Sequence, residues 1–305
     1  ELNRTCDDPE DLAETEFTRF IFDDHPIGRP ILGTKETVMS FTPSDIKEYK
    51  DRFCGNPNMV IAVAGGVGLS ETASMLEEFF GSIPKKEKVV WLPFQPKAEH
   101  APAKILTRRG TPQAHLHIGG LTPSYRSPHV RASILLSEIL SNRLYLDVRS
   151  EKALAYRVFA EARMFSDAGM FIAYAGVEPS REAVLRATQT TLCHMADIKS
   201  GNVSDDEVEE SRALLHGRID LGLESVWTIA SFFATHELLL GRPKSVEEIH
   251  NEIDAVTKGG VLRLAQEVWQ EENVRSLLLT KTRFWFLNSF PDYEKKYGKL
   301  RKVLR

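Results

Sequence analysis

The sequence predicts an α+β sandwich fold arranged in two parts. Strand and helix patterns are mixed within each part instead of alternating strictly, which argues against a doubly wound parallel sheet. Residues 45–65 and 257–280 both run from a helix through an apolar strand to a polar turn, which indicates an internal duplication. The length of 305 residues, 42% of them hydrophobic, also favours two domains over one.

The first part is predicted to contain three helices and one buried strand. Thr42 and Pro43 are typical of a helix start, and Ser70 is the expected cap of the following helix. A continuous apolar run closed by two glycines predicts the strand. The expected elements are, in order, a helix over residues 8–22, a loop over 25–30, a helix from 42 to 53, a strand over 59–64 and a helix from 70 to about 80.

A linker is predicted after this first part. Residues 84–102 contain lysines and four prolines without clear periodicity, which is the composition of a connection between domains. The predicted division is a first domain over residues 1–84, a linker over 85–102, a second domain over 103–282 and a tail over 283–305.

The second part is predicted to hold a strand hairpin and several long helices. Ser204 and Glu207 have the spacing of a capping box, which predicts a long helix running toward residue 240. The other expected elements are an alternating strand at 115–118, a helix at 132–140, strands at 155–162 and 170–175, a helix after residue 179, a helix at 257–269 and a strand at 274–280.

Composition excludes several classes of partner. With 39 basic and 43 acidic residues the formal net charge is -4, so no bulk positive field exists to attract nucleic acid or an anionic membrane. No apolar run approaches the ~20 residues that span a bilayer, which predicts a soluble chain. The three cysteines, at wide spacing, are expected to be reduced thiols, which favours the cytoplasm or an organelle matrix.

Metal and nucleophile motifs are sparse in the sequence. Neither His-x-x-Glu-His nor His-Glu-x-x-His occurs, and His236 with Glu237 lacks a second ligand four residues on. His115 and His117 lie on one face of the expected strand, as two metal ligands would, but no third ligand is identifiable near them. The glycines of residues 65–68 lack the spacing of a phosphate-binding loop, and no Gly-x-Ser-x-Gly elbow occurs.

The order of motifs resembles peptidase family M16, the zinc metallopeptidases that include insulinase, pitrilysin and the mitochondrial processing peptidase. The resemblance covers nearly everything from residue 1 to about 280. Its matching segments are DDPEDL at 7–12, DHPIGRPILGT at 24–34, NMVIAVAG at 58–65, SNRLY at 141–145, RSEKALAY at 149–156, VSDDE at 203–207 and LES at 223–225.

The resemblance implies two similar α/β-sandwich domains that face each other around a closed chamber enclosing a peptide. In that family His-x-x-Glu-His and a later glutamate bind Zn²⁺, which activates a water molecule to attack the peptide bond. By this resemblance Glu1 matches the third metal ligand, and Arg149 and Tyr156 match residues directed at the substrate and its oxyanion. Ala153 departs from the pattern by replacing a usual glycine, and Ser150 replaces a common acidic residue.

The resemblance thus predicts that the first domain is incomplete and that this chain alone binds no zinc and is inactive. The leading hypothesis is a fragment or truncated form of a zinc metalloendopeptidase that hydrolyses peptides or unfolded polypeptides. One alternative is a non-catalytic partner subunit, which lends Arg149 and Tyr156, or merely its shape, to a separate zinc-bearing M16 chain. Another is an inactive relic. The partner chain would be a zinc-bearing M16 chain or a second copy of this chain in a homo-oligomer. Loss of the preceding strands is expected to leave one edge of the first sheet unpaired.

Overall fold

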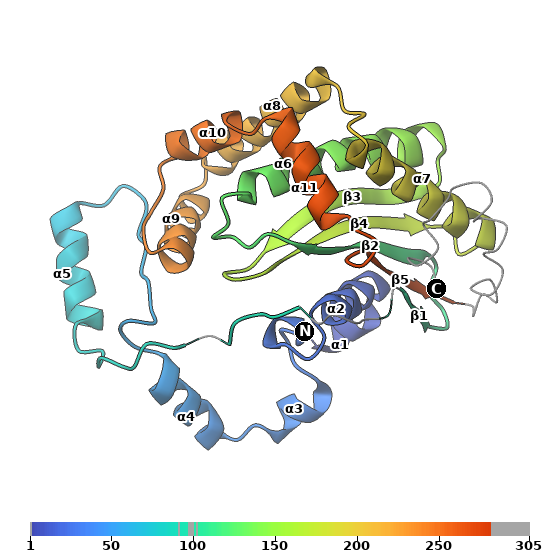
Figure 1. The fold of residues 1–305 in the computed structure, drawn as a ribbon. Coiled ribbons are helices and arrows are strands. Elements are labelled where there is room, and N and C mark those ends of the chain that lie inside the picture. Colours follow the sequence, from blue (N-terminus) through green and yellow to red (C-terminus); the bar gives the residue numbers. More distant parts are fainter. Residues whose placement is uncertain (1, 91, 97–100, 102, 282–305) are drawn as a thin grey trace. The chain divides into compact units, whose positions relative to one another are not determined.

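The computed structural model describes residues 2–90, 92–96, 101 and 103–281 (Figure 1). Within these limits the chain forms two compact units. The first comprises residues up to 33 together with 94–212 and those from 253 onward, and the second comprises 34–93 and 213–252. The domain boundaries predicted from the linker composition stay a prediction. No helix of the described residues is long and apolar enough to cross a membrane.

A mixed five-stranded sheet forms the centre of the first unit. The first strand pairs in parallel with the last, and every other neighbouring pair is antiparallel. The α+β class predicted from the sequence is therefore confirmed. Across the sheet the strands are, in spatial order, β1 (Ala103–Thr107), β5 (Arg275–Thr280), β2 (Ala114–Thr122), β4 (Gly169–Val177) and β3 (Ala155–Met164).

Helices cover both faces of this sheet, so its central strands are buried on both sides. On one face lie α6 (Val130–Leu144), α7 (Arg181–Lys199) and α11 (Lys258–Val268), as Figure 1 shows. Phe171 of β4 meets Trp269 there, edge to face, with ring centroids 5.2 Å apart. All nine residues of β4 are buried, which explains its nearly continuous apolar sequence.

The other face is covered by α2 (Pro9–Phe22), which Asp8 caps by accepting hydrogen bonds from two backbone N–H groups. Apolar α2 side chains such as Phe17 and Ile21 pack against Ile172 and Leu279 of the sheet. Buried Arg275 of β5 donates to carbonyl groups in the last turn of α2 and so stabilises its C-terminus. Ion pairs that join α2 to the sheet in the described part of the chain include Glu10–Arg157, Glu14–Arg163 and Glu16–Lys104.

The hairpin and most of the predicted helices are confirmed. β3 and β4 pair antiparallel as expected, and the capping box of Ser204 and Glu207 is present at the start of α8 (Asp205–Gly222). The single long helix predicted from there toward residue 240 is wrong. It is two helices, because the chain turns after Gly222 and Ser225 becomes the N-cap of α9 (Val226–Leu240).

The second unit holds several short helices. Thr42 caps α4 as predicted, through a capping box with Asp45, whereas the expected cap of α5 by Ser70 is wrong because Gly68 takes the N-cap position without a side-chain bond. Besides the C-terminal part of α8 and α9, the helices of this unit are α3 (Lys35–Ser40), α4 (Pro43–Phe53), α5 (Leu69–Phe80) and α10 (Val246–Asp254), whose last residues fall in the first unit.

The buried strand predicted at residues 59–64 is also wrong. This segment has no strand structure, and the side chains of Met59, Ile61 and Val63 are exposed. A strand requires a neighbouring strand to satisfy its backbone N–H and C=O groups, and the described residues of the second unit supply none. An apolar run by itself therefore did not determine the strand.

Candidate functional site

Three irregularities of the backbone follow one another between residues 145 and 157. A π-helical turn (Tyr145–Glu151) continues directly from the end of α6. Ala153 then has a positive φ of 48°, and a β-bulge interrupts the first pairs of β3. Such features are costly or rare, and they are frequent at functional sites. The segment is therefore the candidate site of the chain.

The π-helical turn presents Arg149 to solvent. Leu144 and Val148 are fully buried and anchor the turn against the first unit, whereas Tyr145 and Arg149 are exposed. The Arg149 guanidinium lies over the Tyr145 ring, 5.2 Å from its centroid. This cation–π contact helps to orient the Arg149 guanidinium, whose side chain is exposed and is not held by the buried core.

The positive φ of Ala153 reverses the chain between the turn and the strand. A backbone in this left-handed region places Cβ close to the neighbouring carbonyl oxygen, which costs about 1–2 kcal/mol for a residue other than glycine. The reversal is fixed by two backbone hydrogen bonds, from Lys152 N to Asp147 O at 3.0 Å and from Leu154 N to Val148 O at 2.8 Å. The turn therefore folds back onto the start of β3.

The bulge turns Tyr156 out of the sheet. Ala155 pairs with Val177 and Arg157 pairs with Gly176, so Tyr156 lies opposite no residue of β4. Its side chain is 82% exposed although the neighbouring Ala155 is buried. An extra residue in one strand re-aims a side chain in this way. Arg149 and Tyr156 thus come from adjoining segments, and both point away from the core.

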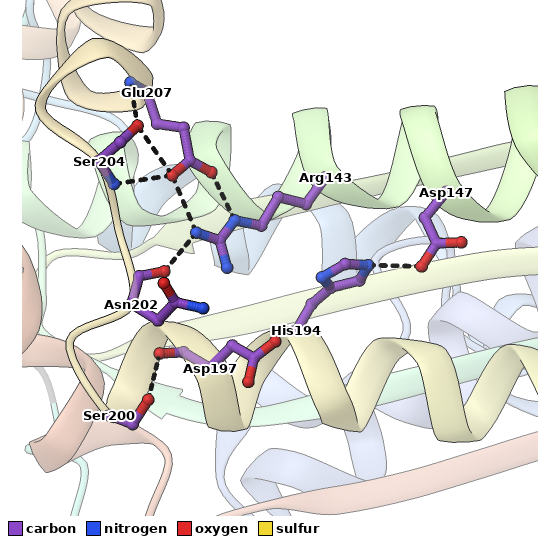
Figure 2. A network of polar contacts seen from close by, with 8 residues as sticks. All are labelled: Arg143, Asp147, His194, Asp197, Ser200, Asn202, Ser204 and Glu207. Atoms are coloured by element: carbon purple, nitrogen blue, oxygen red, sulfur yellow. Dashed lines mark hydrogen bonds and ion pairs between the residues drawn. The ribbon is translucent and has the colours of Figure 1, made fainter.

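Polar contacts hold the turn from behind. Asp147 accepts hydrogen bonds from Lys152 Nζ at 2.7 Å and lies 2.9 Å from Nε2 of His194 on α7. Figure 2 shows the Asp147–His194 contact beside a second pair, Arg143 and Glu207. Partial burial alone would raise the pKa of Asp147, but the hydrogen bonds from Lys152 and His194 outweigh it and lower this pKa. The carboxylate is therefore charged at neutral pH.

The described residues do not form a zinc site. No group of three or more His, Cys, Asp or Glu side chains among them has the geometry to hold a metal ion. Glu1, the predicted third ligand, lies outside the described residues. The donor set in the described part of the chain therefore does not fit zinc.

His115 and His117, the other metal candidates, belong to the buried core. Both project from the same face of β2, as expected. Nδ1 of His115 lies 3.0 Å from the Tyr174 hydroxyl, and the His117 ring packs between Phe17 and Tyr174. Burial, followed by repulsion from His115 and Arg163, lowers the pKa of His117 to about 3. Both imidazoles are therefore neutral at pH 7.

Sequence reasoning named Arg149 and Tyr156 but missed how they are displayed. No single residue type predicts the π-helical turn, the bulge or the contacts to α7. Each of these features depends on hydrogen bonds that do not follow the regular spacing of a helix or strand, or that join residues far apart in the sequence. A signal that could have indicated the special backbone is the glycine that the family usually has at the position of Ala153, because glycine favours a positive φ.

Comparison with known proteins gives the family. A family model described as the peptidase M16 inactive domain matches residues 40–215, more than half of the chain. The "Uncharacterized zinc protease YmxG" of Bacillus subtilis is 32% identical over 283 residues, which cover 91% of this chain and 68% of that protein. The "Uncharacterized zinc protease ML0855" of Mycobacterium leprae is 32% identical over 275 residues, covering 88% and 61%.

The fold agrees with these matches. A crystal structure of a peptidase M16 inactive domain from Pseudomonas fluorescens superposes with a TM-score of 0.81 at 17% identity, covering 92% of this chain and 68% of that one. A mixed sheet covered by helices on both faces is therefore the fold that this chain shares with that domain. The chain belongs to peptidase family M16, and it spans about two thirds of the length of the relatives that it matches.

Proposed function

We propose that this chain supplies the substrate-facing half of an M16-type zinc endopeptidase, which hydrolyses peptides in a chamber closed by two similar domains. The observation that carries the proposal is the display of Arg149 and Tyr156 by the π-helical turn and the bulge. The π-helical turn and the positive φ of Ala153 are energetically unfavourable. Core packing alone does not explain them, since neither Arg149 nor Tyr156 packs into the core. The names of the two sequence relatives as zinc proteases support the same activity.

The chemistry of the two side chains suits this role. A guanidinium donates paired hydrogen bonds to peptide carbonyls, and a phenol donates one to the oxyanion that forms when a carbonyl is attacked. The zinc that activates the attacking water must be held by a His-x-x-Glu-His helix, which this sequence lacks. In this proposal the chain by itself is inactive and becomes part of an active site only together with a zinc-bearing half.

The experiment begins with protein from its native source. Intact mass and zinc analysis show whether the zinc-bearing half is joined to this chain or co-purifies with it, and hydrolysis of a quenched fluorescent peptide measures activity. Arg149→Ala and Tyr156→Phe are expected to lower kcat/KM by about 100-fold or more with zinc content unchanged. Matched controls are Arg186→Ala and Tyr49→Phe, because both side chains are exposed and lie outside the candidate site. Full activity of both site variants would overturn the proposal.

A non-catalytic partner subunit is the second candidate. It is favoured by the description of the matched family model as an inactive domain and by the lack of a metal-binding group in the described residues. In that case a separate zinc-bearing chain co-purifies at its own mass. This subunit then lends Arg149 and Tyr156, or merely its shape, to that chain. Activity that needs the subunit but not Arg149 or Tyr156 would indicate that it lends shape alone.

A further inference from the structure

The turn that carries Arg149 is attached to α7 by contacts that do not include Arg149 itself. Asp147, two residues before it, contacts His194 Nε2 at 2.9 Å. Lys152, three residues after it, bonds Asp147 at 2.7 Å and Thr190 Oγ1 at 3.3 Å. Thr190 and His194 are four residues apart on α7, so they lie on one face of the helix. Asp147 and Lys152, which flank Arg149, thus contact His194 and Thr190, which lie one helical turn apart on α7.

The contacts to α7 add to the two backbone hydrogen bonds and the buried Val148, which hold the inner side of the turn. Its π-type hydrogen-bond pattern is rare and occurs mostly as single turns inserted into α-helices. Tyr145, Leu146 and Arg149 are exposed and contribute no burial to the core, and only Val148 anchors the turn from within. The polar contacts to α7 therefore hold the turn on its outer side, in addition to the stacking of Arg149 on the Tyr145 ring.

The contacts are partly shielded from water, which strengthens them. The side chains of Asp147 and His194 are mostly buried, whereas Lys152 is about half exposed. A hydrogen bond to a charged group in such surroundings is stronger than a surface ion pair. Removal of His194 leaves the mostly buried Asp147 carboxylate with Lys152 as its remaining donor on this turn. Figure 2 shows the His194 ring directed at Asp147 from α7.

We propose that Asp147, Lys152 and His194 form a clamp on α7 that positions Arg149 toward the substrate. They are positioning residues, since none of them needs to touch the substrate. The contacts of the clamp exist in the chain whatever its function, and only their effect on catalysis rests on the proposed function.

Hydrogen exchange on the full chain tests the clamp without any activity. In His194→Ala, the amides of residues 146–154 are expected to exchange about tenfold faster, as the loss of one such hydrogen bond predicts. His194→Gln keeps an N–H donor and is expected to restore slow exchange, and Arg186→Ala on the same helix serves as the matched control. Unchanged exchange in His194→Ala, or an equal increase throughout α6 and β4, would overturn the clamp.

Kinetics of the zinc-loaded assembly test its consequence. His194→Ala is expected to lower kcat/KM at least about tenfold mainly through kcat, with recovery in His194→Gln. In an Arg149→Ala background the same change is expected to have little further effect, because the group to be positioned is gone. Additive losses would show that His194 acts independently of Arg149. If Arg149→Ala itself retains activity, the proposed function fails while the exchange result still decides the clamp.

Discussion

Arg143 binds both carboxylate oxygens of Glu207, a residue 64 positions further along the chain. The Arg143 Nε–Glu207 Oε1 distance is 2.6 Å and the Nη2–Oε2 distance is 2.9 Å. The same guanidinium donates to the Asn202 carbonyl at 2.6 Å, as Figure 2 shows. Glu207 also completes the capping box with Ser204. One arginine therefore connects the end of α6, just before the π-helical turn, to the start of α8.

Replacement of this arginine by lysine tests the bidentate geometry. Arg143→Lys keeps the charge but cannot make two parallel bonds to Glu207 and a third to Asn202. We expect it to lower the free energy of unfolding by about 1–2 kcal/mol, as measured by urea unfolding. Arg186→Lys, on an exposed i,i+4 pair with Glu182, should change it by less than about 0.5 kcal/mol. Equal effects would show that the fork geometry does not matter.

Buried His117 should make stability depend on pH. Its pKa is about 3 in the folded chain against 6.5 when exposed, so between these values the unfolded state binds a proton that the folded state does not. The contribution of His117 to the free energy of unfolding is therefore fully present above pH 6.5. It is lost as pH falls from 6.5 toward 3, by an amount on the order of a few kcal/mol.

The check is the urea midpoint at pH 7, 5.5 and 4.5. His117→Leu should show a smaller loss between these pH values than the native chain. Some dependence will remain, because burial lowers the pKa of His115 as well. His129→Gln is the control, since this exposed histidine makes no side-chain cap bond to α6. An unaltered pH dependence in His117→Leu would contradict the prediction.

Two tyrosines allow the same substitution at opposite extremes of burial. Tyr174 is 1% exposed and its hydroxyl lies 3.0 Å from Nδ1 of His115, whereas Tyr156 projects into solvent. Tyr174→Phe leaves the His115 nitrogen without this partner and should destabilise the chain by about 1–3 kcal/mol. Tyr156→Phe should change stability by less than about 0.5 kcal/mol, so its effect on peptide hydrolysis cannot be attributed to unfolding. Thermal unfolding of both variants tests the contrast.

Ala153 offers a substitution that relieves strain. Glycine adopts a positive φ without the steric cost that alanine bears, but it also loses more conformational entropy on folding. The two effects partly offset each other, so Ala153→Gly should raise the free energy of unfolding by up to about 1 kcal/mol. Ala155→Gly, two residues on in the buried start of β3, should lower it by about 1 kcal/mol. Urea unfolding of both variants measures these changes in the free energy of unfolding. A lower free energy of unfolding in Ala153→Gly would contradict the strain argument.

Prediction from the sequence succeeded where local signals and tertiary packing agree. The helix predicted over residues 8–22, the helix capped by Thr42 and the capping box of Ser204 all formed as expected, because each start depends on residues within one turn. The strand at residues 59–64 failed for the opposite reason. Its pattern was correct for a strand, but strand pairing requires a partner that a local pattern does not supply.

The candidate site shows the same division. Arg149 and Tyr156 were named by their place in the family pattern, and the structure adds that a bulge and a π-helical turn display them. The attachment of Asp147 to His194 joins residues 47 positions apart, so no spacing within a motif could indicate it.

The sequence by itself determined the α+β class, the membership of peptidase family M16 and most helix boundaries, because these follow from periodicity, capping residues and matching motifs. Only the tertiary structure decided which apolar runs became strands, which histidines became neutral core residues and how Arg149 is held. Those outcomes depend on long-range hydrogen bonds and burial, whose partners come together only when the chain has folded.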